Sequence, residues 1–267
     1  MKVNVYDIAG QVKKQITLPK AFDTEIRPRL ITRAYVSSLT KKIQPKGTYI
    51  DAGRNTSALY VGKRRIRDSL IAVGEARKPR TKNARHLVQG RVAGIPGVVG
   101  GPKAHPPKVE TVIAEKINKK ERKLALLCAL AATTNRELVF GKGHIVDEKM
   151  TLPIIIEDKV EGIRKTKDIY NILESLKIEQ DVETAKKKKT MRAGKGKKRG
   201  RIYRRKKSIL FVVSDDKAKA IKGVRNLEGV DVSTVKNLSV EKLAPGGKAG
   251  RLVIFTESAV NALAKNE

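Results

Sequence analysis

Residues 152–157 read LPIIIE, and this run decides the fold class. The isoleucines Ile154, Ile155 and Ile156 are consecutive, whereas a strand with one solvent-facing side would alternate apolar and polar residues. A short continuous apolar run is typical of a strand that is buried on both faces, as in a parallel sheet covered by helices. The run Ile209–Val213 has the same character. These two runs predict the centre of a buried sheet.

The segments around these runs alternate between strand and helix patterns. Apolar residues recur at helical spacing in Thr24–Leu39, in Thr166–Ile178 and beyond Pro107, where the stripe runs from Ile113 to Ala131. Ser214-Asp215-Asp216 predicts the N-cap of a helix that continues through Ile221 and Val224. Further strands are expected at Lys2–Tyr6, Gln11–Leu18, Val230–Val235 and Leu252–Phe255, with helices near Ser239–Leu243 and around Val260 and Leu263. This alternation predicts an α/β fold with a mainly parallel sheet and flanking helices.

Two segments without a core pattern carry most of the net charge of +32. Lys63–Lys108 contains twelve basic residues against Asp68 and Glu75, and Lys186–Lys207 contains fourteen basic residues and no acidic one. Such segments cannot bury an apolar face that repays chain entropy, and their like charges repel unless an external anion is present. We therefore predict one globular domain of residues 1–44 and 110–267. A long extended loop at 45–109 and a basic extension at 182–207 are expected to be inserted in it.

A positive field of this size attracts nucleic acid or an anionic membrane surface. No apolar run approaches the length of a membrane span, and Met1–Gly10 resembles a strand rather than a signal peptide, so no membrane role is expected. Cys128 is the single cysteine, which fits a reducing compartment and a place in the core. Aromatic residues make up 4% of the chain, which argues against stacking on single-stranded bases. Folded RNA, bound through its shape and phosphates, is the expected partner.

Motifs for catalysis or cofactor binding fail on spacing. Gly94-x-x-Gly97-x-x-Gly100 differs from the dinucleotide fingerprint, and Gly247-Lys248 lacks the remaining residues of a phosphate-binding loop. The histidines, His86, His105 and His144, do not have the spacing of metal ligands. We expect no cofactor and no metal. Glu157 and Asp158, at the end of a predicted strand, are the best acid–base pair for an enzyme alternative.

Several stretches carry a more specific signal. These are Gly74–Arg80 (GEARKPR), Ala104–Lys108 (AHPPK), Ile117–Ala125 (INKKERKLA), the basic run Arg192–Arg205 and Leu243–Leu252 (LAPGGKAGRL). Together they resemble, in the same order and over nearly the whole chain, the archaeal and eukaryotic branch of the universal large-subunit ribosomal protein four family.

The resemblance implies a structural protein of the large ribosomal subunit that is not an enzyme. It implies binding and stabilisation of large-subunit rRNA during assembly, with the long loop lining the polypeptide exit tunnel. The implied partners are large-subunit rRNA, neighbouring large-subunit proteins and the nascent polypeptide near the loop tip. The implied location is the ribosome of the cytoplasm, without a membrane and without a homo-oligomer.

The expected RNA-binding residues are the cations of the two segments and one histidine. In the loop they are Arg54, Lys63, Arg64, Arg65, Arg67, Arg77, Lys78, Arg80, Lys82, Arg85, Arg91, Lys103, His105 and Lys108; in the extension they are Arg192, Lys195, Lys197, Lys198, Arg199, Arg201, Arg204 and Arg205. Two alternatives stay open. One is an RNA-modifying enzyme whose basic insertions hold the substrate, and the other is a free protein that compacts nucleic acid.

Overall fold

The computed structural model describes residues 1–82, 87, 89–147 and 150–265. The chain divides into two compact units. The globular unit comprises Met1–Lys42 and Ala114–Glu267, and the insertion unit comprises Ile43–Ile113.

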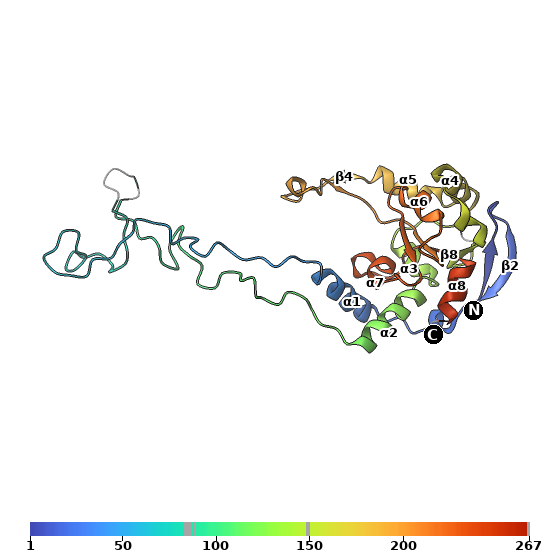
Figure 1. Cartoon of the computed structure of the whole chain (residues 1–267), viewed down its shortest axis with the longest axis horizontal. Helices are drawn as coiled ribbons and strands as arrows, with labels where there is room; N and C mark the ends of the chain where they lie inside the picture. The colour runs from blue at the N-terminus through green and yellow to red at the C-terminus, as the bar shows by residue number, and fades with distance from the viewer. Residues whose placement is uncertain (83–86, 88, 148–149, 266–267) are drawn as a thin grey trace. The chain divides into compact units, whose positions relative to one another are not determined.

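The globular unit is built on a twisted sheet (Figure 1). Within the described residues this sheet has six strands in the order β2-β1-β3-β8-β6-β7. Neighbours are parallel throughout, except that β2 pairs antiparallel with β1 at one edge. The strands are β1 (Lys2–Tyr6), β2 (Val12–Thr17), β3 (Ile154–Ile156), β6 (Leu210–Val213), β7 (Asp231–Thr234) and β8 (Val253–Thr256). The predicted α/β class with a mainly parallel sheet is confirmed.

Helices cover both faces of this sheet, because successive strand residues point to opposite sides. In β6, Leu210 and Val212 face one core, and Phe211 and Val213 face the other. The first core is closed by η1 (Lys20–Asp23), α1 (Pro28–Thr40), α2 (Lys119–Ala131), α7 (Val240–Leu243) and α8 (Glu257–Lys265). The second is closed by α3 (Arg136–Gly141), η2 (Asp158–Gly162), α4 (Thr166–Ser175), α5 (Glu179–Lys187) and α6 (Ala220–Arg225). Every residue of β3, β6 and β8 is therefore buried.

Some element boundaries differ from the prediction. Helix α2 begins at Lys119 rather than near Ile113, since the backbone of Asn118 before it is extended. The predicted N-cap at Ser214 is wrong: α6 begins at Ala220, and the Ser214 hydroxyl donates to the Glu161 carboxylate instead. Helices α3 and α5 were not predicted. Because α5 extends to Lys187 and buries Val182 and Ala185, the first residues of the predicted basic extension belong to the core.

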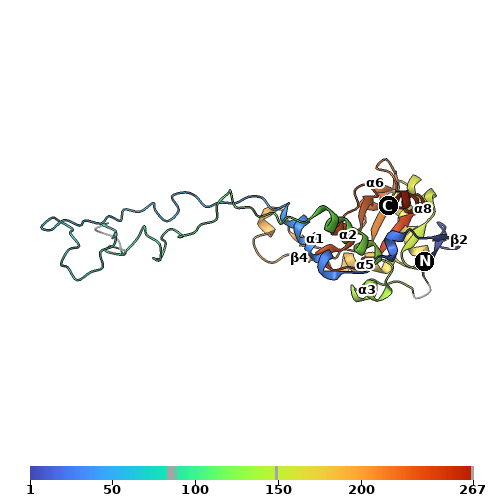
Figure 2. The ribbon, with the colours of Figure 1, turned by 90° about the horizontal axis from the view of Figure 1, so that it is seen from below.

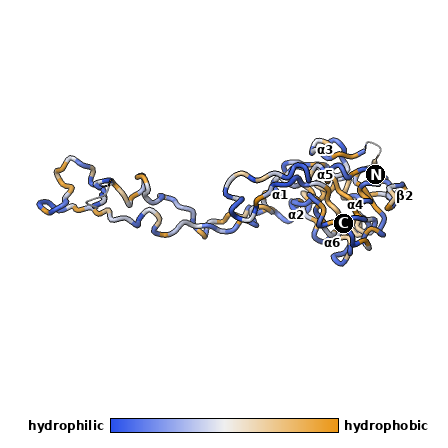
Figure 3. The backbone as a smooth tube through the Cα atoms, turned by 90° about the horizontal axis from the view of Figure 1, so that it is seen from above, coloured by the Kyte–Doolittle hydropathy of each residue, from blue (hydrophilic) through white to orange (hydrophobic). Residues whose placement is uncertain are grey.

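In the insertion unit, the described residues form neither a helix nor a continuous strand. Figure 3 shows a mostly hydrophilic chain with scattered hydrophobic positions, in contrast to the apolar strands of the globular unit. Single β-bridges join Leu59 to Arg80 and Arg80 to Val92. At Gly53 the backbone has φ +79° and passes so close to Gly101 that a Cβ would lie 2.4 Å from its carbonyl carbon. Only glycine fits there without displacing the backbone.

Candidate nucleic-acid interface

The insertion unit presents most of its predicted RNA-binding side chains to solvent. Arg54, Lys63, Arg64, Arg65, Arg67, Arg77, Lys78, Arg91, Lys103, His105 and Lys108 are all exposed. Arg85 lies outside the described residues. These exposed cations leave the phosphate-binding ends of their side chains available, as a polyanion-binding surface requires.

Two predicted RNA-binding residues of the insertion unit are held in internal contacts instead. The Arg80 side chain is 19% exposed, and its Nε lies 2.9 Å from a Glu75 carboxylate oxygen. Its Nη1 donates to the Gly90 carbonyl at 2.8 Å, and its backbone pairs with Leu59. Lys82 lies 3.7 Å from the Asp68 carboxylate in the same way. Arg80 therefore ties three runs of chain together, which its sequence context did not indicate.

A small hairpin in the globular unit carries the second set of predicted residues. It consists of β4 (Thr190–Met191) and β5 (Tyr203–Arg204), with η3 (Lys197–Arg199) between them. Figures 1 and 2 show the hairpin standing out from the sheet and helices of its unit. The predicted residues Arg192, Lys195, Lys197, Lys198, Arg199, Arg201, Arg204 and Arg205 are all exposed.

Contacts within this hairpin join its two sides, and one ion pair ties it to the rest of the globular unit. The Arg192 Nε donates to the Arg201 carbonyl at 3.2 Å, and the Lys189 ammonium lies 4.8 Å from the centre of the Tyr203 ring. Arg205 forms an ion pair with Glu228 at 3.1 Å. Like-charge repulsion along the hairpin is therefore opposed by a few specific contacts.

A cationic groove of about 780 Å³ lies at the base of the hairpin. It is lined by Lys142, Lys187, Lys188, Thr190, Arg204, Arg205, Lys206, Lys207, Pro245 and Gly246, which include seven cations and no carboxylate. The lining segments lead into strands β3, β6 and β8, so the groove lies at the amino edge of the parallel sheet. The sequence pattern identified the charge of the run around Lys206. It gave no signal for Lys142, a single lysine that folding brings to the same place.

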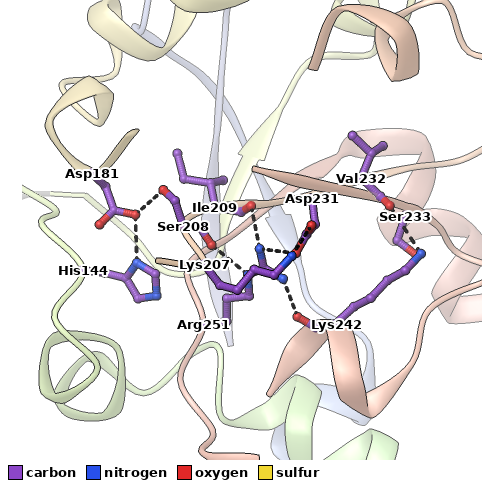
Figure 4. A network of polar contacts seen from close by, with 10 residues as sticks. All are labelled: His144, Asp181, Lys207, Ser208, Ile209, Asp231, Val232, Ser233, Lys242 and Arg251. Carbon is purple, nitrogen blue, oxygen red and sulfur yellow. Dashed lines mark hydrogen bonds and ion pairs between the residues drawn. The ribbon is translucent and has the colours of Figure 1, made fainter. Parts of the chain in front are cut away.

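A buried carboxylate anchors the segment that leaves the hairpin toward β6. Asp181 in α5 accepts hydrogen bonds from His144 Nδ1 at 3.0 Å, from Ser208 Oγ at 2.5 Å and from Lys206 Nζ at 2.7 Å. Burial alone would raise the pKa of Asp181, but hydrogen bonding and electrostatic attraction from His144, and then Lys206 and Ser208, lower it to about 2. Figure 4 shows His144 and Ser208 both pointing at the carboxylate rather than at each other. The arrangement therefore differs from a nucleophile–base–acid triad.

A second buried charge lies beside it, as Figure 4 also shows. The guanidinium of Arg251 is fully buried and donates to the carbonyls of Ser208 at 2.7 Å, Lys242 at 2.8 Å and Ile209 at 3.1 Å. Asp231 accepts from both Arg251 and Lys207, each at 2.8 Å. Charged hydrogen bonds thus hold Lys206 and Lys207 in place at the mouth of the groove.

The carboxyl edge of the sheet, where ligands of open α/β folds usually bind, is occupied by the protein's own side chains. Glu161 accepts from the Ser214 backbone N–H at 2.9 Å, from Thr256 Oγ1 at 2.7 Å and from Ser258 Oγ at 3.1 Å. Burial would raise the pKa of Glu161, but the hydrogen bonds from Ser214, Thr256 and Ser258 hold it below its usual range.

The carboxylates kept for an enzyme alternative are engaged in structural contacts. Glu157 forms an ion pair with Lys13 at 2.8 Å, and Asp158 accepts from the Ser258 backbone N–H at 2.7 Å. Cys128 is buried, and its Sγ donates to the Glu25 carbonyl at 3.1 Å. In the described part of the chain no three His, Cys, Asp or Glu side chains are placed to share a metal ion, and no helix there has the length and apolarity to cross a bilayer.

The fold and surface define a strongly basic α/β protein with a cationic insertion unit, a cationic hairpin and a filled carboxyl edge. Residues 16–266 match the model of the ribosomal protein L4/L1 family. Large ribosomal subunit protein uL4 of Methanocaldococcus jannaschii is 48% identical over 263 residues, 98% of each chain. The uL4 protein of Methanosphaera stadtmanae is 44% identical (98% of this chain, 96% of the relative), and that of Sulfurisphaera tokodaii is 43% identical (99% and 94%).

The chain therefore belongs to the ribosomal protein L4/L1 family, and it is a large-subunit ribosomal protein. The resemblance found in the sequence is confirmed. These relatives are named as ribosomal proteins and not as enzymes, which also confirms the non-enzymatic expectation.

Proposed function

We propose that this protein binds and stabilises large-subunit rRNA during assembly of the cytoplasmic ribosome. One observation carries the proposal: in a member of a ribosomal protein family, exposed Lys and Arg side chains gather on the insertion unit and on the β4–β5 hairpin. Arg and Lys side chains neutralise phosphates, and the released counterions supply much of the affinity. Specificity comes from the folded shape of the RNA.

The insertion unit has the further role of lining the polypeptide exit tunnel in this proposal. Its support is the resemblance to the family together with the Gly- and Pro-rich, helix-free chain of Ile43–Ile113. The nascent polypeptide and neighbouring large-subunit proteins are the partners proposed for it. Arg80 and Lys82 then serve to shape this unit, while their exposed neighbours contact RNA.

The RNA-modifying enzyme is the weaker alternative. A substrate pocket would be expected at the carboxyl edge of the sheet, where Glu161 already binds Ser214, Thr256 and Ser258. The groove with positive charge lies at the opposite edge.

The test replaces three exposed cations of the hairpin, Lys197→Gln, Lys198→Gln and Arg199→Gln, in one variant. Binding to purified large-subunit rRNA is measured at several salt concentrations. Removing one cation that neutralises a phosphate lowers the magnitude of the slope of log affinity against log salt by about 0.7–0.9, so the three changes should lower it by about 2–3. In cells, the same variant should be depleted from large subunits separated on a sucrose gradient.

The matched control removes the same charge elsewhere on the globular unit, with Lys217→Gln, Lys219→Gln and Lys236→Gln, which are also exposed. This control should keep the wild-type slope and incorporate normally. An equal fall in slope for the two variants would show that net charge alone governs the binding, and it would contradict a defined interface.

A further inference from the structure

The cations of the groove at the base of the hairpin are not equivalent. Four of the seven have carboxylate partners: Lys187 with Glu183 at 3.3 Å, Arg205 with Glu228 at 3.1 Å, Lys206 with Asp181 at 2.7 Å and Lys207 with Asp231 at 2.8 Å. The other three are Lys142, Lys188 and Arg204, and among the described residues none of their charged groups has a carboxylate partner. An uncompensated set of cations remains in a groove whose lining has no acidic residue.

These three residues come from separate places in the chain. Lys142 follows α3, Lys188 follows α5 and Arg204 lies in β5. Thr190 adds a hydroxyl to the same lining. Behind them, Lys206 is held by the buried Asp181 and Lys207 by Asp231. Several cationic donors around one open space have the chemistry of an oxyanion seat.

We propose that this groove seats a backbone phosphate of RNA, bound by Lys142, Lys188 and Arg204 on the globular unit itself. The inference rests on the proposed function and adds a site that neither the composition of the basic segments nor their exposure revealed. Its occupant is a phosphodiester of folded RNA, because the groove lies at the base of the cationic hairpin that is proposed to bind the same RNA.

Lys142 gives this site a distinctive property. Burial, and then the positive charges of Arg251 and Lys248, together lower its pKa to about 7. It donates a hydrogen bond to the Lys248 carbonyl. The other charged groups that line the groove are Lys187, Lys188 and the run Arg204–Lys207, all cationic. The carboxylates next to them, Glu183, Glu228, Asp181 and Asp231, each pair with one of these cations, and His144 donates to Asp181.

Lys142 has no carboxylate partner among the described residues, and a phosphate in the groove supplies the missing negative charge next to its ammonium group. An anion next to an ammonium favours its charged form, so the pKa of Lys142 should rise when RNA binds. The protein then takes up a proton at this site near neutral pH, and RNA binding strengthens as the pH falls from about 8 to about 6.

The experiment uses the full chain with its lysines reductively methylated with ¹³C-formaldehyde, a change that keeps their charge. The Lys142 signal is identified by its disappearance in the Lys142→Arg variant, and its pH midpoint is followed by NMR. In free protein the midpoint should lie near 7, and with large-subunit rRNA fragments it should rise by at least one unit. Inorganic phosphate is the second probe. If inorganic phosphate raises the Lys142 midpoint less than RNA does, and only at higher concentration, phosphate is supported as the recognised group.

Two variants separate charge from titration. Lys142→Met should weaken RNA binding about tenfold at pH 6, as expected for one charged hydrogen-bonding partner, and change it little at pH 9. Lys142→Arg should keep the binding and abolish the pH dependence, because arginine stays charged. Lys219→Met, an exposed lysine beyond the carboxyl end of β6, is the control and should behave as wild type.

The ways in which the two proposals can fail are distinguishable. If RNA binds tightly while the Lys142 midpoint stays fixed, the phosphate seat is refuted and the proposed rRNA binding stands. If the wild-type chain does not bind rRNA at low salt, the proposed function itself fails.

Discussion

Replacing Asp181 by Asn tests whether the buried network holds the groove together. The wild-type carboxylate accepts hydrogen bonds from His144, Ser208 and Lys206 and is fully buried. An asparagine of the same size offers one acceptor oxygen and turns an N–H₂ group toward a former donor. Lys206 then keeps its bond to the Gly143 carbonyl at 2.8 Å but loses its counter-charge.

The magnitude follows from the geometry of the pair. Removing one partner of a buried ion pair typically costs about 3–5 kcal/mol. The Lys206 side chain is 17% exposed, so water reaches part of it, and the lower end of that range applies. We expect the free energy of unfolding to fall by about 3 kcal/mol, and Tm by about 6–12 °C for a unit of this size.

The assay is urea and thermal unfolding followed by circular dichroism, with Asp215→Asn as the matched control. Asp215 is exposed, so the same chemical change there should alter the free energy of unfolding by less than about 0.5 kcal/mol. A decrease below about 1 kcal/mol for Asp181→Asn would refute the reasoning, since the charge would then have contributed little to the folded state.

The stability of the wild type and that of Asp181→Asn should also depend differently on pH. The folded pKa of Asp181 is lowered from the ordinary value of 3.8 to about 2. A lowered carboxylate pKa stabilises the fold above the unfolded value, and this stabilisation is lost as the pH falls from about 4 to about 2. The difference in stability between wild type and Asp181→Asn should shrink in that window, which acid titrations of both proteins would show. A constant difference down to pH 2 would count against the assigned pKa.

Three further substitutions probe other contacts. Glu161→Gln should lower the free energy of unfolding, measured by urea denaturation, by about 2 kcal/mol. The amide of glutamine has one acceptor oxygen and cannot accept all the hydrogen bonds that Ser214, Thr256 and Ser258 donate to the carboxylate. Arg251→Met should cost about 3 kcal/mol, since three carbonyls lose their donor and Asp231, which is 31% exposed, keeps only Lys207; no change in the urea midpoint would contradict this. Glu75→Gln should speed amide exchange in the insertion unit while costing less than about 1 kcal/mol, as expected for a half-exposed pair.

The fold class could be predicted because its signals are local. The continuous apolar runs of β3 and β6 and the periodic stripes of α1 and α4 reflect burial on two faces or on one. Helix α5 was missed because its buried residues are few and its end merges with a lysine run. The start of α6 was misplaced because an N-cap signature cannot show that a distant carboxylate competes for the serine.

The candidate interface was predictable as charge but not as geometry. Composition identified the cations. It could not show that Arg80, unlike its exposed neighbours, is largely buried, because this depends on how the chain folds around Glu75. The groove depends on partners still more distant in the chain. Ser208 meets both Asp181 and Arg251, residues far from it in sequence, and Lys142 joins the site from another connection. Local patterns do not encode such partners.

The position of β8 has a consequence for the order of events during synthesis. This strand is encoded by Val253–Thr256, yet it lies between β3 and β6 and pairs with both. Before those residues are made, the strands synthesised earlier can form at most two partial sheets that share no strand. A nascent chain therefore presents the cations of its insertion unit and its hairpin before its sheet can close.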